Sequence, residues 1–233
     1  LRWLGFPAER TADAVVTPAD WRTEPEAVLT RLRTLPGLTV IRGQVRRLTT
    51  DGFRWTATLA DGSGLAARAV VLATGAAGSL ELPESAARLV TRVHPIRGQI
   101  AVTDRHLVER AVRGPAGYVA PCPDGTVIGA TMDPDRTDLD PDLERGDALV
   151  RACLAQIGIT ESLPVTWRVG VRGATRDGLP MAGTAGPPGL HLALAPRRNG
   201  WLLGPLVART VVDELEGRAA GPFAAVLDPR RLA

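Results

Sequence analysis

The pattern of apolar and polar positions along the chain changes twice. Residues 26–35 predict a helix that Pro36-Gly37 ends. Three strand-like stretches follow, at residues 38–48, 54–59 and 65–74. The last of these leads through ARAVVLATGAAG, which is almost entirely apolar before its glycines and is typical of a strand buried on both faces of a parallel sheet. Its end at Thr74-Gly75 is the kind of carboxyl end where open α/β sheets bind ligands.

The middle section, residues 90–176, has a different pattern. Its strand-like stretches lie at residues 93–102, 117–121, 126–131 and 165–171. The sequence PDG at residues 123–125 makes the middle pair a predicted hairpin. A helix is predicted over residues 141–157, with Asp140 as its N-cap and Gly158 as its end. We therefore expect a mostly antiparallel sheet with one helix packed against it.

The last section, residues 178–233, returns to the first pattern. GLHLALAP predicts a short buried strand, and the residues after it predict a helix from Asn199-Gly200 to Gly217. A helix N-terminus after a strand can face an anionic or electron-rich group, although most such turns bind nothing. The order of elements predicts an α/β fold with an α+β insertion.

Composition narrows the class of protein. A chain of 233 residues with 45% apolar and 23% charged residues has an ordinary soluble, globular composition. No uncharged apolar run reaches the ~18 residues of a membrane span, and Pro7 and Glu9 argue against a leader segment. Two cysteines favour a reduced, cytoplasmic compartment. No metal site is expected, because the three histidines lack ligand spacing.

The positive charge comes entirely from arginine. All 28 basic residues are arginines, and the formal net charge is +3. The arginines are spread along the chain without a block of five or six, which indicates a solvated surface. A tRNA-sized partner stays open, because a few well-placed arginines are enough to neutralise phosphates.

Arg172 stands out among these arginines. It follows the strand-like residues 167–171 in RVGVRGATRDGLPMAG, a stretch that has the pattern of a buried strand. A buried guanidinium needs a partner of opposite charge. From the residues alone, a structural salt bridge with Asp177 or Asp133 is the favoured interpretation.

Four stretches taken together resemble a known family. In chain order they are VVLATGAAG, GYVAPCPDGTVIGATMDP, RVGVRGATRDGLPMAG and LALAPRRNGWLLGPLVA. As a set, over residues 20–233, they resemble the FAD-dependent D-amino-acid oxidase superfamily, most closely its glycine-oxidase-like members. The resemblance implies a partial Rossmann-like FAD-binding layer at residues 1–88 and 178–233. It also implies a substrate domain with an antiparallel sheet at residues 89–177.

The resemblance implies roles for individual residues. Arg172 would bind the substrate carboxylate with its bidentate fork. Tyr118 and Met132 would line the same pocket, and Arg198 would lie above the flavin near the substrate. The predicted cofactor contacts are Val45, Thr74, Gly75, Asn199, Gly200, Trp201 and Leu202. Without the resemblance, Tyr118 is a strand aromatic, Met132 a core residue and Asn199 a simple helix cap.

The implied activity is the oxidation of a small amino-acid-like substrate with FAD as cofactor. The C–N bond of a glycine-like or N-substituted amino acid would become an imine, which water hydrolyses to a 2-oxo acid, with oxygen as electron acceptor. GVRGATRDGLPMAG and VLDPRRL are also similar to the FAD-oxidase domain of a bifunctional tRNA-modifying enzyme. For that alternative, Arg97, Arg113 and Arg136 would form a basic rim. A second alternative is a cofactorless binding or assembly subunit, and a homo-oligomer is left open.

The chain departs from the family pattern near its start. Family members begin with a strand, a G-x-G-x-x-G turn and a helix that hold the FAD pyrophosphate. The early glycines here are Gly5, Gly37 and Gly43, which do not form that pattern. We expect the chain to begin after this first nucleotide-binding unit, with a missing N-terminal segment or a second chain as partner. We also expect these 233 residues alone to bind FAD weakly or not at all.

Overall fold

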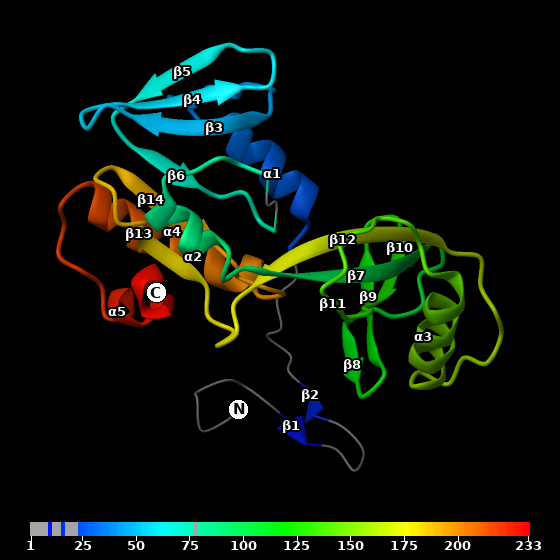
Figure 1. Cartoon of the computed structure of the whole chain (residues 1–233). Helices are drawn as coiled ribbons and strands as arrows, with labels where there is room; N and C mark the ends of the chain where they lie inside the picture. The colour runs from blue at the N-terminus through cyan, green and yellow to red at the C-terminus, as the bar shows by residue number, and fades with distance from the viewer. Residues whose placement is uncertain (1–8, 11–14, 17–22, 77–78) are drawn as a thin grey trace. The chain divides into compact units, whose positions relative to one another are not determined.

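The computed structural model describes residues 9–10, 15–16, 23–76 and 79–233 (Figure 1). The chain forms two compact units, residues 1–42 and 43–233. In the first unit, β1 (Glu9–Arg10) pairs antiparallel with β2 (Val15–Val16). The same unit contains α1 (Pro25–Arg33), which confirms the helix predicted over residues 26–35. A proline in its first turn and arginines in its last turn suit the two helix ends.

The strand predicted at residues 38–48 is shorter in the structure. β3 (Val45–Thr50) pairs with β4 (Trp55–Leu59), and β4 pairs with β5 (Gly64–Ala67), in an antiparallel sheet. Residues 38–44 form no strand. That part of the prediction was wrong, because apolar β-branched residues form a strand only where a neighbouring strand supplies backbone partners.

The stretch predicted as one strand at residues 65–74 forms two. Its first part is β5, whereas β6 (Val70–Leu72) belongs to another sheet of the order β13–β14–β6. In that sheet β14 (Leu190–Leu194) runs parallel to β6 and antiparallel to β13 (Met181–Thr184). The pairing of β6 with β14 confirms that these two distant segments lie in one layer.

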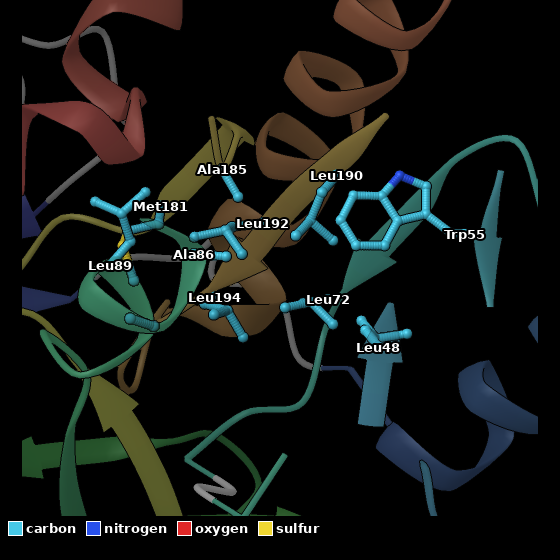
Figure 2. Packing of buried hydrophobic residues seen from close by; sticks show 11 residues of the cluster. Leu48, Trp55, Leu72, Ala86, Leu89, Met181, Ala185, Leu190, Leu192 and Leu194 are labelled. Atoms are coloured by element: carbon cyan, nitrogen blue, oxygen red, sulfur yellow. The ribbon is translucent and has the colours of Figure 1, made fainter. Parts of the chain in front are cut away.

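Helices cover both faces of the β13–β14–β6 sheet. Figure 2 shows the face against α2 (Glu84–Val90), where Leu192 of β14 lies close to Ala86 of the helix. α4 (Gly200–Leu215) packs on the other face over β13 and β14. Val71 of β6 is 40% exposed, because α4 does not extend over this edge strand. The prediction that β6 is buried on both faces was therefore wrong.

The main core joins this sheet to the β3–β4–β5 sheet. Trp55 is 1% exposed and packs with Leu48 and Leu190 (Figure 2). Its indole Nε1 donates a hydrogen bond to the carbonyl of Pro188 at 2.9 Å. Burying the indole with its N–H satisfied avoids the cost of an unpaired polar atom. This contact holds the loop before β14 against the neighbouring sheet.

The antiparallel sheet of the middle section is built on β7 (His94–Thr103). β12 (Thr166–Ala174) runs along one side of β7. Along the other side lie β10 (Gly125–Gly129) and β11 (Asp133–Pro134). The strands that extend the sheet beyond β10 are β9 (Gly117–Cys122) and β8 (Val112–Gly114). The pairing of β9 with β10 confirms the predicted hairpin.

α3 (Leu143–Ala155) packs against this sheet and begins two residues later than predicted. The carboxylate of Asp142 accepts a hydrogen bond from the Arg145 N–H at 3.2 Å, so Asp142 and not Asp140 is the N-cap. Two short helices complete the described chain, α5 (Ala224–Leu227) and a 3-10 helix (Pro229–Leu232). In the part of the chain that the structure describes, no helix has the length and apolar character needed to cross a membrane.

The mixed architecture confirms the predicted fold class, α/β with an antiparallel insertion. The domain boundaries at residues 88–89 and 177–178 stay a prediction.

Candidate functional site

Three of the predicted site residues lie on one face of the antiparallel sheet. Arg172 of β12 is directly opposite Ile96 of β7, and Tyr118 of β9 is directly opposite Gly129 of β10. Because side chains alternate along a strand, the even-numbered residues of β7 and β12 share this face with Tyr118. Asp133 pairs with Arg97, whose side chain is on the other face, and we therefore assign Met132, the residue before Asp133, to this face by alternation. The sheet thus brings together side chains that are 14 to 54 residues apart in sequence.

Two glycines make room for the polar groups on this face. A Cβ atom at Gly98 would collide with the guanidinium of Arg172, so that guanidinium lies directly over Gly98 of the neighbouring strand. A Cβ atom at Gly129 would lie 3.0 Å from the Tyr118 hydroxyl. Glycine in a strand often marks such a close approach of another group. The two polar side chains therefore cover adjacent glycine positions of β7 and β10.

The carboxylates that could have paired with Arg172 are bound to other arginines. Asp133 Oδ2 accepts from Arg97 Nη1 at 2.9 Å, and Asp177 Oδ2 accepts from Arg231 Nε at 2.8 Å. Within the described residues, the Arg172 side chain has neither an ion pair nor a hydrogen-bond partner. The structural salt bridge favoured from the residues alone was wrong. A half-buried cation without a counter-charge is suited to an anionic ligand.

Burial raises the pKa of the Tyr118 phenol, and the nearby Arg172 charge only partly opposes that shift. The phenol therefore keeps its proton at neutral pH and can donate a hydrogen bond. A guanidinium and a phenol O–H on one face form a donor set that matches a carboxylate.

All of the predicted cofactor residues except Val45 lie at a second place, the carboxyl edge of β6 and β14. Parallel strands end at the same edge, so the Thr74-Gly75 turn and the turn before α4 are neighbours there. A Cβ at Gly173 would lie 3.1 Å from the Gly75 carbonyl oxygen, and the Arg197 N–H donates to the Gly173 carbonyl at 3.1 Å. The end of β12, one residue after Arg172, thus contacts both turns.

The N-terminus of α4 lies at this edge. Asn199 is its N-cap residue, but the Asn199 side chain makes no capping hydrogen bond, so the prediction of a simple helix cap was wrong. The first-turn N–H groups, those of Gly200, Trp201 and Leu202, have no carbonyl partner within the helix. Leu202 is 78% exposed. These donors and the positive end of the helix dipole are open to a ligand.

Of the two other predicted residues, Arg198 lies on the surface and Val45 lies in another sheet. The Arg198 side chain is exposed, and no ion pair with it occurs among the described residues. Val45 is half-buried in the β3–β4–β5 sheet and packs against the main core. The structure therefore does not bring Val45 to the edge where the turn residues meet.

A pocket of about 490 Å³ is lined by neighbours of both groups, but by none of the predicted site residues themselves. Ile96 and Pro134 line it, and both stand in the same cross-strand row as Arg172. Its far side includes Arg197, in the turn before α4. The pocket therefore adjoins the sheet face that carries Arg172 on one side. On another side it adjoins the turn at the carboxyl edge of the parallel strands. Its volume is in the range of sites for small ligands and cofactors.

Several pocket residues were not predicted from the sequence. Asp135 and Arg197 line the pocket and hold left-handed φ angles of 60° and 51°, which are uncommon for residues other than glycine. Such local strain is frequent at ligand sites. No sequence pattern signals it. Among the described residues, no cluster of His, Cys, Asp or Glu is arranged to hold a metal ion.

The turn at one wall of the pocket should make stability depend on pH. The Arg231 hydrogen bond, with smaller contributions from Leu179 and Thr175, lowers the pKa of Asp177 from 3.8 to about 2. The folded pKa lies below the unfolded one, so this stabilisation is complete above about pH 4 and is lost as the pH falls towards 2. Because the Asp177 side chain is 35% exposed, we expect at most about 1 kcal/mol.

Urea unfolding of the parent and of Asp177→Asn checks this expectation. The difference in unfolding free energy should be present at pH 6 and shrink at pH 3. A difference of equal size at both values would contradict the assigned ion pair.

Comparison with known proteins identifies the family. The family described as DAO, FAD dependent oxidoreductase, matches residues 3–214, and the chain belongs to it. The chain is 34% identical over 202 residues to the bifunctional protein of tRNA 5-methylaminomethyl-2-thiouridine biosynthesis from Caulobacter sp. (strain K31), a match that covers 82% of this chain and 33% of that protein. It is 30% identical over 187 residues to glycine oxidase from Pseudomonas aeruginosa, covering 77% and 49%.

A solved structure gives the same result. The crystal structure of glycine oxidase from Geobacillus kaustophilus matches with a TM-score of 0.65 and 27% identity, over 79% of this chain and 51% of that one. The resemblance identified from the four sequence stretches is thus confirmed. The chain spans 33% and 49% of the length of the two curated relatives.

The residues at the carboxyl edge fit one end of FAD, the cofactor that the family implies. The uncapped N–H groups of α4 are suitable donors for the electron-rich pyrimidine edge of a flavin, and the adjoining pocket gives space for a planar ring. The described residues do not fit the pyrophosphate of FAD. In the described part of the chain, no glycine-rich turn leads from a strand into the N-terminus of a helix.

Proposed function

We propose that this chain forms the substrate-binding and flavin-edge part of an FAD-dependent oxidoreductase that oxidises the C–N bond of glycine-like or N-substituted amino acids. The observation that carries the proposal is the guanidinium of Arg172. It has no described partner of opposite charge, lies beside Tyr118, and belongs to a face that leads into the pocket. Oxygen as electron acceptor is part of the proposal.

In this proposal, Arg172 binds the substrate carboxylate through two parallel N–H···O bonds and fixes its orientation. Tyr118 keeps its proton and donates a further hydrogen bond to the carboxylate. Met132 forms an apolar wall beside the substrate. With the carboxylate held, the α-carbon is directed towards the pocket and the α4 N-terminus, and most of the catalytic effect of these residues comes from orientation.

FAD, when bound, supplies the two-electron acceptor for the α-carbon hydrogen. The N–H groups of Gly200, Trp201 and Leu202 would hold its ring edge. The Asn199 N–H, also predicted for this role, donates to the Pro196 carbonyl at 2.9 Å and is not one of these donors. The positive end of the α4 dipole would favour negative charge at that edge. Thr74 and Gly75 would contact the cofactor from the neighbouring turn, and Arg198 would lie above it near the substrate.

A second candidate function is the oxidation of a modified nucleoside in tRNA. The observation that favours it is the charge of the substrate face. Arg113, Arg168 and Arg172 occupy this face, and no Asp or Glu stands on it in strands β7 to β12. Such a face would attract an anionic substrate larger than glycine.

The basic rim predicted for that candidate needs correction. Arg97 is completely buried and holds Asp133, so it is not available to a phosphate. Arg136 is paired with Asp138 at 2.7 Å, which neutralises much of its charge. Arg113 remains on the surface. The prediction of Arg97 was wrong because the strand pattern around it did not show which face each residue occupies.

Flavin retention tests the cofactor part of the proposal. We expect the 233-residue chain alone to lose FAD during purification, because the residues that the structure describes include no fitting pyrophosphate site. Co-expression with a segment that carries the strand, G-x-G-x-x-G turn and helix should restore flavin absorbance near ~450 nm. Stoichiometric FAD in the single chain would contradict this expectation. If no supplied segment restored flavin, the cofactorless alternative would be favoured.

Retention of tRNA at low salt then separates the two enzymatic candidates. An oxidase of small amino acids should not retain tRNA, whereas the nucleoside-oxidising candidate should retain it and release it as salt increases. Arg168→Met should weaken that retention if the substrate face makes the contact.

A further inference from the structure

Arg231 links two segments that are far apart in the sequence. It lies in the 3-10 helix (Pro229–Leu232), and its side chain is only 16% exposed. Arg231 Nε donates to Asp177 Oδ2 at 2.8 Å, and Nη2 donates to the Leu179 carbonyl at 2.9 Å. The third nitrogen, Nη1, donates to the Leu227 carbonyl at 3.0 Å. One guanidinium therefore fastens the turn after β12 to the end of α5.

The turn held in this way forms one wall of the pocket. Residues 175–178 line the pocket opposite His94 and Ile96 of β7. Within the turn, Asp177 Oδ1 accepts from the Leu179 N–H at 3.0 Å, and the Gly178 N–H donates to the Thr175 carbonyl at 3.1 Å. These bonds give the turn its shape but do not fix it to the rest of the protein.

Burial holds the two ends of the turn but not its middle. Thr175 is 6% exposed and Pro180 is fully buried, whereas Leu179 is 37% exposed, so its side chain anchors the turn weakly. Gly178 has a φ of 75°, which favours glycine, and a glycine has no side chain that could pack against the rest of the protein. Arg231 forms an ion pair with Asp177 of the turn, although the two residues are 54 positions apart in sequence. The turn begins directly after β12, which carries Arg172.

We propose that Arg231 is a positioning residue that acts through Asp177 to hold the wall of the pocket at the correct distance from β7. This inference rests on the proposed function for the role of the pocket, but the contact itself does not. A displacement of about 1 Å at a binding wall is enough to change ligand affinity and turnover up to a hundredfold. A single, largely buried guanidinium that makes five hydrogen bonds is suited to prevent it.

Arg230 provides a matched control. It lies in the same 3-10 helix and carries the same charge, but its guanidinium pairs with Asp228 at 2.5 Å and is 61% exposed. Arg230→Met therefore removes one arginine next to Arg231 without touching the turn. Arg231→Lys is a conservative variant that keeps the charge. A single ammonium cannot reach the Asp177 carboxylate and the three carbonyls that the guanidinium contacts in the same way.

Amide hydrogen exchange of the 233-residue chain tests the contact without any cofactor. In Arg231→Met, exchange at Gly178 and Leu179 should become about tenfold faster or more, while Arg230→Met should match the parent. Arg231→Lys should fall between them. Equal exchange in the Arg230 and Arg231 variants would overturn the proposal. If Arg231→Met failed to fold, Asp177→Asn gives the same readout from the other side of the contact.

The FAD dissociation constant of the flavin-loaded protein tests the positioning role. It should rise about tenfold in Arg231→Met and stay at the parent value in Arg230→Met. If Arg231→Met showed faster amide exchange but an unchanged FAD dissociation constant, Arg231 would be a structural contact only, and the proposed positioning role would be wrong. If the parent chain bound no FAD even when co-expressed with the nucleotide-binding segment, the proposed function would fail, and the exchange result would still decide whether Arg231 holds the turn.

Discussion

Replacing Arg172 with methionine should lower kcat/KM for glycine-like acids roughly a hundredfold and leave the FAD spectrum and the fold intact. A charge-assisted bidentate contact in a partly desolvated place contributes on the order of 3 kcal/mol to transition-state binding. The Arg172 guanidinium has no described ion pair to lose, so its removal breaks no structural salt bridge. Steady-state kinetics on the flavin-loaded enzyme, together with its melting temperature, would measure both effects.

Three companion variants sharpen this test. Arg172→Lys should recover little activity, because a point charge on a flexible stem does not reproduce the guanidinium fork. Gly98→Ala should reproduce part of the loss, since its Cβ would push the Arg172 guanidinium aside. Gly170→Ala is the matched control, because Gly170 pairs with Gly98 across the strands and a Cβ atom at Gly170 would meet no other atom within 4 Å. A large loss of stability in Arg172→Met with ordinary turnover would contradict the anchor role.

Replacing Asp133 with alanine should destabilise the protein by about 3 kcal/mol or more. Asp133 is 2% exposed and Arg97 is fully buried, so removing this carboxylate leaves a buried cation whose remaining ion pair is with the part-exposed Asp138, at 3.1 Å. Arg97 also donates to the Asp138 carbonyl at 3.1 Å, and Asp133 Oδ1 forms an ion pair with Arg145 at 2.5 Å. Urea unfolding monitored by tryptophan fluorescence would give the change in free energy.

The control for Asp133 is Asp147→Ala, which removes an exposed carboxylate of α3 and should change stability by less than about 0.5 kcal/mol. The double variant Arg97→Met with Asp133→Leu should recover at least part of the loss, because it removes both buried charges together. If Asp133→Ala were as stable as the control, the buried pair would have no structural role.

Local patterns were sufficient to predict much of the fold. The hairpin of β9 and β10 follows from the turn residues at 123–125. The helix α4 ends at Leu215, two residues before Gly217, whose φ of 64° suits the end of a helix. The division of residues 65–74 into β5 and β6 could not be predicted in this way. Both parts are apolar, and which sheet each one joins depends on β4 and β14, far away in the sequence.

The same distinction applies to the candidate site. Alternation on β12 and the hairpin register could place Arg172 and Tyr118 on one face, but only the fold reveals that Gly98 lies beneath the guanidinium. The partners of Asp133 and Asp177 are arginines 36 and 54 residues away. No local pattern connects such pairs, and so the salt bridge expected for Arg172 was assigned wrongly.

Anaerobic reduction of the flavin-loaded enzyme tests the central claim most directly. Glycine, sarcosine and a neutral amine of similar size would each be mixed with parent and Arg172→Met enzyme, and the rate of loss of flavin absorbance recorded. We expect rapid reduction of the parent by the two acids and slow reduction by the neutral amine. We also expect Arg172→Met to lose the rate with the acids and not with the neutral amine. An equal loss for all three amines, or no loss for the acids, would contradict Arg172 as the carboxylate anchor.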